Sequence, residues 1–289
     1  MVYVQILIDG ILLGGLYACM GIGFSVIWGV MNIINLAHGS MIIMGAYITY
    51  WIWKDWGLDP FATIPISAAA LFCVGFFLQK YLLNRVVAGS VFLSLIITFG
   101  LDMVLRNAHI VLFEVDPRAV ETSYSSDSLY VGSLHLAYTR IGVFAIAIVL
   151  TLLLVVFMNR TRTGNAIKAT SFDVEAAQLS GMNTARVYSI TFGIGTMMAG
   201  IAGSLIATVQ SFQPEYSIPY TTRSFVVVIL GGLGSIPGAI AGGLVLAIAE
   251  DYTGYWKPGY TELVSFGLLL AVLLVRRRGL FGKRFYAEL

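Results

Sequence analysis

The sequence predicts an all-α, polytopic membrane protein, and three observations lead to this fold class. Of its 289 residues, 58% are hydrophobic and 11% are charged, against about 25% charged residues in an ordinary soluble domain. The mean hydropathy is +0.86. Apolar residues form long uninterrupted runs instead of alternating with polar ones. Such runs suit transmembrane helices, which need about 20 apolar residues, and do not suit barrel strands.

We expect about eight hydrophobic segments, one after another along the chain. No linker or shift in composition divides them, so a single transmembrane domain over residues 1–289 is predicted. The segments cover 5–30, 36–53, 61–83, 91–113, 140–158, 187–212, 223–250 and 261–276.

Topology follows from the distribution of Lys and Arg, because short loops rich in these residues remain in the cytoplasm. The cations gather after the third segment, between the fifth and sixth, and after the last: Lys80, Arg85, Arg160, Arg162, Lys168, Arg186, Arg276, Arg277, Arg278, Lys283 and Arg284. Acidic residues prevail in the connection at about 114–139 and in two apparent short loops, which hold Asp55 with Asp59 and Glu250 with Asp251. These regions are expected outside, together with the N-terminus.

The seventh segment does not fit a simple crossing. By this topology, residues 223–250 begin and end on the same side, yet 28 residues are too few for two full spans at 1.5 Å per residue. The middle of the segment, 231–238, reads Gly-Gly-Leu-Gly-Ser-Ile-Pro-Gly, which breaks a helix. We therefore predict a re-entrant element with a break near 231–238. A single tilted, kinked helix is the alternative.

The connection between the first two segments is also unusual. Residues 32–40 interrupt the apolar sequence, and no Lys or Arg lies nearby. A cytoplasmic loop would normally carry cations. We therefore expect this connection to be buried within the protein, where non-helical backbone at membrane depth is tolerated.

A polar, basic stretch over about 160–187 predicts a cytoplasmic loop with a short helix. Residues 175–179 (Glu-Ala-Ala-Gln-Leu) are good helix formers, Ser171 or Asp173 suits the N-cap, and Gly181 suits the end of the helix. A short helix at the membrane surface with two alanines can fit into a groove of a soluble partner. An ordinary amphipathic connector is the alternative.

Three stretches together resemble the branched-chain amino acid permeases of the LivH/LivM type. They are Arg160–Gly203 with its EAA-x-x-x-G segment, 29–39 with the Asn-x-Ala-His-Gly pattern followed by Met44–Tyr47, and 231–239. They span nearly the whole chain, and the Asn-x-Ala-His-Gly pattern is specific to this branch. The chain lacks long extra segments and is more similar to LivH than to LivM.

The resemblance implies the permease subunit of an ATP-driven ABC importer in the inner membrane of a bacterial or archaeal cell. Its partners would be two ABC ATPase subunits, a LivM-like second permease or a second copy, a periplasmic substrate-binding protein and membrane lipid, with no nucleic acid. The chain has no Gly-x-x-x-x-Gly-Lys-Ser/Thr sequence. It is therefore not expected to be an enzyme or to hold a cofactor, and ATP would be bound by the partners. The coupling residues would be Glu175, Ala176, Ala177 and Gly181.

The two breaks supply the candidate groups of a substrate path, since half-helix ends carry fixed partial charges that can bind a zwitterion. The candidates are Asn35, His38, Gly39, Ser40, Gly231, Gly232, Gly234 and Ser235. For His38, a hydrogen-bonded structural role is the alternative to a place in the path.

Asp102 and Arg106 lie four residues apart inside the fourth segment and predict an intramembrane ion pair. A structural role is the first expectation and a direct transport role the second, because charges within spans are costly. No metal site is expected: Cys19 and Cys73 lie in apolar stretches, and the three histidines lack metal-ligand spacing.

Several alternatives remain open on the sequence alone. Urea and short-chain amide permeases share the Asn-x-Ala-His-Gly segment, so the machine is better specified than its ligand. A secondary transporter would usually place acidic residues within its spans, where Asp102 is the convincing candidate. A passive channel also uses re-entrant breaks, but neither rival requires an EAA-x-x-x-G docking loop.

Overall fold

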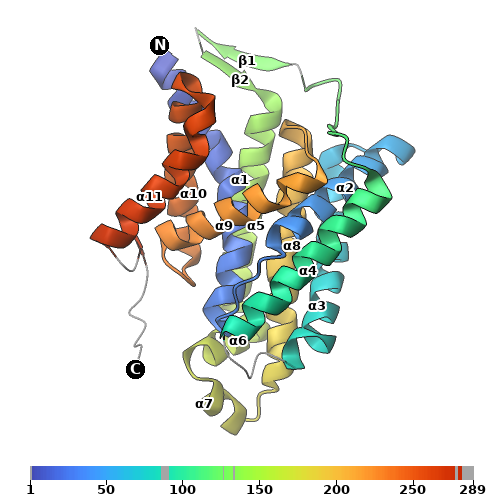
Figure 1. The fold of residues 1–289 in the computed structure, drawn as a ribbon, viewed down its shortest axis with the longest axis vertical. Helices are drawn as coiled ribbons and strands as arrows, with labels where there is room; N and C mark the ends of the chain where they lie inside the picture. The colour runs from blue at the N-terminus through green and yellow to red at the C-terminus, as the bar shows by residue number, and fades with distance from the viewer. Residues whose placement is uncertain (1, 86–90, 126, 133, 277–278, 282–289) are drawn as a thin grey trace.

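The computed structural model describes residues 2–85, 91–125, 127–132, 134–276 and 279–281. Long helices run side by side along one axis, with shorter helices at one end and across the middle (Figure 1). The helices are α1 (Val2–Met31), α2 (His38–Trp56), α3 (Pro60–Tyr81), α4 (Val91–Phe113), α5 (Tyr138–Arg160), α6 (Arg162–Phe172), α7 (Val174–Leu179), α8 (Thr184–Val209), α9 (Ser217–Gly231), α10 (Ile236–Trp256) and α11 (Thr261–Val275). Short 3-10 turns cover Leu83–Arg85, Pro214–Tyr216 and Pro258–Tyr260.

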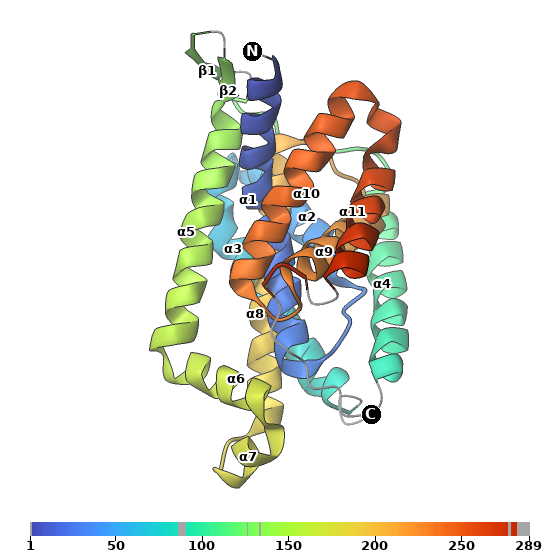
Figure 2. The ribbon, with the colours of Figure 1, turned by 90° about the vertical axis from the view of Figure 1, so that its left-hand side faces the viewer.

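The two ends of the bundle differ in charge and structure. Helices α6 and α7 project from one end, which we call the basic end, and the start of α1 lies beside a small hairpin at the other, the hairpin end (Figure 2). Asn84, after α3, donates a hydrogen bond to the Ala185 carbonyl of α8 at 3.2 Å, so the cations around α3, α6 and α8 share the basic end. The predicted tail cations Arg277, Arg278, Lys283 and Arg284 lie outside the described residues.

The hydrophobic segments form the predicted helices. Within the described residues, six helical segments are long and apolar enough to cross a membrane: α1, α4, α5 and α8, α3 with the 3-10 turn that follows it, and α11 with the 3-10 turn that precedes it. The predicted break in the seventh segment is confirmed, because α9 and α10 meet at an angle of 116°. Figure 1 shows α9 lying across the long helices, whereas α10 runs along them.

The broken pair enters and leaves at the same end of the bundle, as the re-entrant prediction requires. Before the pair, Phe212 and Arg118 exchange backbone hydrogen bonds at 2.8 and 2.9 Å, so the chain lies against the connection that leads to the hairpin. After the pair, the Tyr252 hydroxyl donates to the Tyr3 carbonyl at 2.9 Å, near the start of α1. Both junctions therefore lie toward the hairpin end.

Helices α1 and α8 form the centre of the bundle. In the most apolar window of each, 89% of the residues are buried, against 17% for α4 and 6% for α11. Small residues bring the central backbones together: a Cβ at Gly45 of α2 would lie 2.7 Å from the Gly200 Cα of α8. Such contacts replace bulky packing when helices associate in a membrane. The apolar outer faces of α4 and α11 remain for lipid or a second subunit.

Two elements were not predicted. Strands β1 (Ser128–Val131) and β2 (Leu134–Ala137) pair antiparallel within the connection at about 114–139, for which only an outer location was predicted. Helix α6 occupies the first half of the predicted basic loop. Neither changes the membrane architecture, since both lie at the ends of the bundle (Figure 2).

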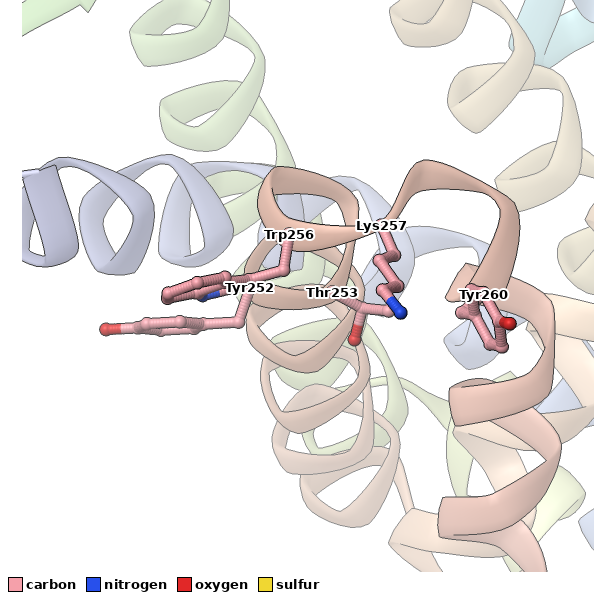
Figure 3. Close-up of a pocket in the computed structure, with 5 residues that line it drawn as sticks. All are labelled: Tyr252, Thr253, Trp256, Lys257 and Tyr260. Carbon is pink, nitrogen blue, oxygen red and sulfur yellow. The ribbon is translucent and has the colours of Figure 1, made fainter.

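The turn between α10 and α11 carries an exposed aromatic cluster. Tyr252 and Trp256 project to the same side of α10, while Lys257 and Tyr260 lie at the turn beyond it (Figure 3). Trp256 is 65% exposed, and the Lys257 ammonium lies 5.4 Å from the centre of the Tyr260 ring. Amphipathic rings of this kind mark the boundary between the hydrocarbon and water. The hollow of about 390 Å³ between them is therefore consistent with an interfacial belt.

Candidate functional site

The first break, between α1 and α2, is largely buried, as predicted, although Asn32 at its start is exposed. Asn35 and Ala37 are fully buried, and the polar backbone is satisfied by side chains from other helices. Thr98 of α4 donates to the Ile34 carbonyl at 2.7 Å, and Thr221 of α9 donates to the Leu36 carbonyl at 3.2 Å. Non-helical backbone at membrane depth needs such partners. Helices α4 and α9 therefore hold the break in place.

The two breaks are joined by close backbone contacts. Gly39, in the first turn of α2, donates its N–H to Thr221 Oγ1 of α9 at 2.8 Å. A Cβ at Gly39 would collide with the carbonyl oxygen of Ser217. A Cβ at Gly29, near the end of α1, would lie 2.8 Å from the Gly234 Cα of the second break. The two breaks, although about 200 residues apart in the sequence, are therefore packed in one region of the protein.

The second break is specified by its glycines and by a helix cap. Gly232 and Gly234 have φ angles of 104° and 76°, which L-residues rarely adopt. Gly231 packs against the Gly238 carbonyl so closely that no side chain fits. Ser235 caps α10 by accepting a hydrogen bond from the Gly238 N–H at 3.1 Å. Gly231 and Gly232 are buried, whereas Gly234 is exposed and Ser235 is partly exposed.

The polar side chains of the first break point into the protein. His38 is fully buried, and its Nε2 lies 3.0 Å from the Met20 carbonyl of α1. The Asn35 amide nitrogen lies 3.9 Å from Met41 Sδ. The contact with the Met20 carbonyl is of the kind that the structural alternative for His38 requires. A role for these residues in the substrate path remains a prediction.

The predicted Asp102–Arg106 ion pair is not formed. Asp102 is 5% exposed, and its carboxylate accepts a hydrogen bond from the Ser40 hydroxyl at 2.5 Å. Between described residues, the ion pairs are Arg118–Glu114, Arg140–Asp9 and Arg223–Glu250. The spacing places Asp102 and Arg106 on one face of α4, but a hydroxyl from α2 lies in contact with the carboxylate. Ser40 is thus a partner of Asp102.

The coupling segment folds as a short, protruding helix. Asp173 Oδ1 accepts a hydrogen bond from the Ala176 N–H at 2.9 Å and caps α7, as the sequence predicted. Gly181 has a φ of 82° and ends the turn. Ala177 is buried, Glu175 and Ala176 are exposed, and Leu179 is 90% exposed. The elbow formed by α6 and α7 projects beyond the other helices of the basic end (Figure 2).

A buried charged cluster was missed, because the sequence placed Glu250 in an outer loop. Glu250 instead lies within α10 and is 6% exposed. Its carboxylate accepts hydrogen bonds from Tyr17 at 2.5 Å, Ser265 at 2.6 Å and Arg223 Nε at 3.1 Å. Four helices, α1, α9, α10 and α11, therefore meet at one carboxylate. The available sequence signal was Arg223, a charged residue at the start of the apolar segment 223–250 that needs an acidic partner.

In the part of the chain that the structure describes, no group of three or more His, Cys, Asp or Glu side chains could hold a metal ion. Cys19 is buried and Cys73 is exposed, and both are free thiols.

Fold and site together define a polytopic membrane protein of the transporter class, with two helix breaks in its core and a protruding elbow at one end. The chain belongs to the family described as the branched-chain amino acid transport system / permease component, whose model matches residues 6–273.

Two relatives, LivH and BraD, are similar to this chain over nearly their whole length. The chain is 30% identical to the high-affinity branched-chain amino acid transport system permease protein LivH of Escherichia coli (strain K12), covering 97% of this chain and 96% of LivH. It is 28% identical to BraD of Pseudomonas aeruginosa, with the same coverage of 97% and 96%. LivM of Escherichia coli (strain K12) is 25% identical, but only 67% of LivM is covered. These values confirm the prediction that the chain is more similar to LivH than to LivM.

Proposed function

We propose that this chain is the permease subunit of an ATP-driven ABC importer and forms the translocation path for branched-chain, hydrophobic amino acids. Two ABC ATPase subunits bind at the basic end, in the cytoplasm, and a periplasmic substrate-binding protein delivers the ligand at the hairpin end. A LivM-like permease or a second copy completes the membrane domain in the inner membrane. The names of the relatives support the substrate, and the distribution of cations supports the orientation.

The α6–α7 elbow is the observation that carries this proposal. Leu179 presents an apolar side chain that is 90% exposed at the tip of a polar, basic projection. Helix α7 has six residues, and so short a helix is not stable alone. Caps at both ends maintain it, and it packs against α6 and α8. A rigid apolar knob of this kind fits a groove on a soluble subunit, and Ala176 allows close approach.

The coupling mechanism follows from where the elbow is attached. Helix α8 begins at Thr184, directly after the elbow, and runs through the centre of the bundle. When the ATPases close on ATP, they displace the Glu175–Gly181 segment, and α8 transmits this displacement to the helices around the breaks. ATP remains on the partner subunits, which supply the energy.

Two experiments test the proposal. The tagged chain is purified from its native membrane, and recovery of two ATPases and a second permease is expected. Leucine uptake is then measured in proteoliposomes holding the complete transporter. Leu179→Asp should lower ATP-driven uptake at least roughly tenfold, because docking loses its apolar anchor. The matched control is Leu82→Asp, just after α3 at the same end of the bundle but outside the elbow, where Leu82 is 40% exposed.

The outcomes separate the alternatives. Wild-type uptake by the Leu179→Asp transporter would overturn the assignment of the elbow. A chain that purified alone and carried flux in liposomes without ATP would be a channel or a secondary transporter. Uptake of urea or short-chain amides in place of leucine would support the assignment as an ABC importer but would change the assigned substrate.

A further inference from the structure

A small cavity lies beside the buried charged cluster, between α9, α10 and α11. Its volume is about 190 Å³, well below the roughly 300–1,000 Å³ of pockets for drug-sized ligands. Its wall includes the charged side chains of Arg223, Glu250 and Glu262 and the apolar side chains of Ile218, Val226 and Phe266. The cavity thus combines both charge signs with an apolar surface, at a size suited to one small molecule.

Glu250 fixes the charged side of this cavity. Its two carboxylate oxygens already accept hydrogen bonds from Tyr17, Ser265 and Arg223. A carboxylate so fully occupied has little capacity for another donor. Its role is therefore to hold Arg223 in one orientation, with the guanidinium 5.9 Å from the centre of the Tyr17 ring. Glu250 is a positioning residue.

The two terminal nitrogens of the Arg223 guanidinium are free to bind a ligand. The hydrogen bonds to Glu250 at 3.1 and 3.2 Å come from Nε alone. Throughout the described residues, its terminal nitrogens donate no hydrogen bond, and they are not among the buried unsatisfied atoms. The side chain is 23% exposed. Two parallel N–H groups at the open edge of a guanidinium match the two oxygens of a carboxylate.

The other walls suit the remaining parts of an amino acid. Glu262 is exposed in the first turn of α11, and within the described chain it forms no ion pair. Its carboxylate can accept an ammonium group at the rim. Ile218 and Phe266 are about half exposed and can cover an aliphatic side chain. Charged groups facing lipid are costly, so this opening is expected to face water or a second subunit.

We propose that this cavity is an amino-acid subsite of the permease itself. Arg223 binds the carboxylate, Glu262 binds the ammonium group, and Ile218, Val226 and Phe266 contact the aliphatic side chain. The subsite accepts the ligand at the hairpin end of the path, where the first half of α9 faces the second half of α10. This inference rests on the proposed transport function, but it concerns ligand recognition by this subunit.

Protection of a cysteine tests the subsite in the complete transporter. Thr222, which lines the cavity, is replaced by Cys in a Cys73→Ser background, and modification by a water-soluble thiol reagent is timed. Saturating leucine should slow the modification roughly tenfold. Leucinamide, which lacks the carboxylate, should protect at least roughly tenfold less well, because a hydrogen-bonding site rejects a ligand without its partner group.

Variants of Arg223 assign the carboxylate contact. Arg223→Gln should abolish protection by leucine, and Arg223→Lys should weaken it about tenfold or more, since Lys keeps the charge but not the paired donors. Arg140→Gln is the matched control, because Arg140 pairs with Asp9 at 3.1 Å elsewhere; it should retain full protection. If Arg223→Gln fails to assemble, the Lys variant gives the same test.

The failures of the two proposals differ. Equal labelling with and without leucine, in a transporter that still takes up leucine, would overturn the subsite and leave the proposed function intact. Protection that survives Arg223→Gln would also overturn it. An assembled complex that takes up no branched-chain amino acid would instead refute the proposed function.

Discussion

Gly39→Ala should destabilise the protein strongly, because Gly39 seats α2 on α9. The added Cβ would lie 2.5 Å from Thr221 Oγ1 and collide with the carbonyl oxygen of Ser217. The latter is backbone and cannot rotate away. Overpacking of this kind costs about 1–3 kcal/mol. Weakening the 2.8 Å hydrogen bond from Gly39 N–H to Thr221 adds about 0.5–1.5 kcal/mol, so we expect a loss of about 2–4 kcal/mol.

Thermal unfolding of the purified protein in detergent measures this loss. At about 2–4 °C per kcal/mol for a chain of this size, the midpoint should fall by roughly 5–15 °C. Gly100→Ala is the matched control: Gly100 lies in α4 with nothing within 4 Å of an added Cβ. That change should be neutral or stabilise by up to about 1 kcal/mol, since Ala is the better helix former.

The result also locates the collision. Combining Gly39→Ala with Thr221→Ala removes the hydroxyl but leaves the Ser217 carbonyl in place, so stability should recover only in part. Full recovery would show that the hydroxyl and not the backbone resists the Cβ. A Gly39→Ala midpoint no lower than that of Gly100→Ala would refute the close seating of the two breaks.

Three further predictions concern other parts of the chain. Gly181→Ala should lower ATP-driven uptake while Gly181→Asn retains most of it, because the φ of 82° suits Asn better than Ala; equal uptake by both variants would exclude the backbone as the cause. Ser40→Ala should cost about 1–3 kcal/mol in thermal unfolding by leaving Asp102 without its donor, and adding Asp102→Asn should restore part of the loss; no loss would show that this hydrogen bond is dispensable. In detergent, the membrane-permeant reagent N-ethylmaleimide should modify Cys73, on the outer face of α3, faster than Cys19, which is buried; mass spectrometry of the labelled peptides would expose the reverse order.

The membrane architecture could be predicted because it depends on local composition. A lipid-spanning helix must be apolar along its length, so the hydrophobic segments coincide with the helices to within a few residues. Glycine and proline likewise predict the second break, since they act on the backbone where they stand. Asp173 and Gly181 mark the ends of α7 for the same local reason.

The partners of buried charges could not be predicted, because they are set by contacts between distant segments. Glu250 and Tyr17 are 233 residues apart, and the adjacent Glu-Asp pair at 250–251 resembles an outer loop. Asp102 has Arg106 four residues away in sequence, yet its hydrogen-bond donor, Ser40, is 62 residues away. Spacing along one helix shows which residues share a face. It does not show which other helix packs against that face.

The hairpin was missed for a different reason. Two short segments, Leu-Tyr-Val at 129–131 and Leu-His-Leu at 134–136, flank Gly132-Ser133, which is a turn signal between strands. The acidic residues of this connection predict its side of the membrane, but they carry no information on its local strand pairing. The pairing of Tyr130 with His135 in the register of the two strands was therefore within reach of the sequence.

Helix α9 connects the two parts of the proposed mechanism, the elbow at the basic end and the amino-acid subsite at the hairpin end. In the proposed mechanism, α8 carries displacement from the elbow. Its glycine contacts with α2 leave few side chains to absorb that displacement: a Cβ at Gly203 would lie 2.7 Å from the Ala46 nitrogen. We therefore expect α2 and α8 to move as one body. Gly39 ties α9 to that body, while Arg223 ties the same helix to Glu250 of α10. Motion of α2 and α8 relative to α10 must then alter the Arg223–Glu250 contact, where the proposed subsite lies.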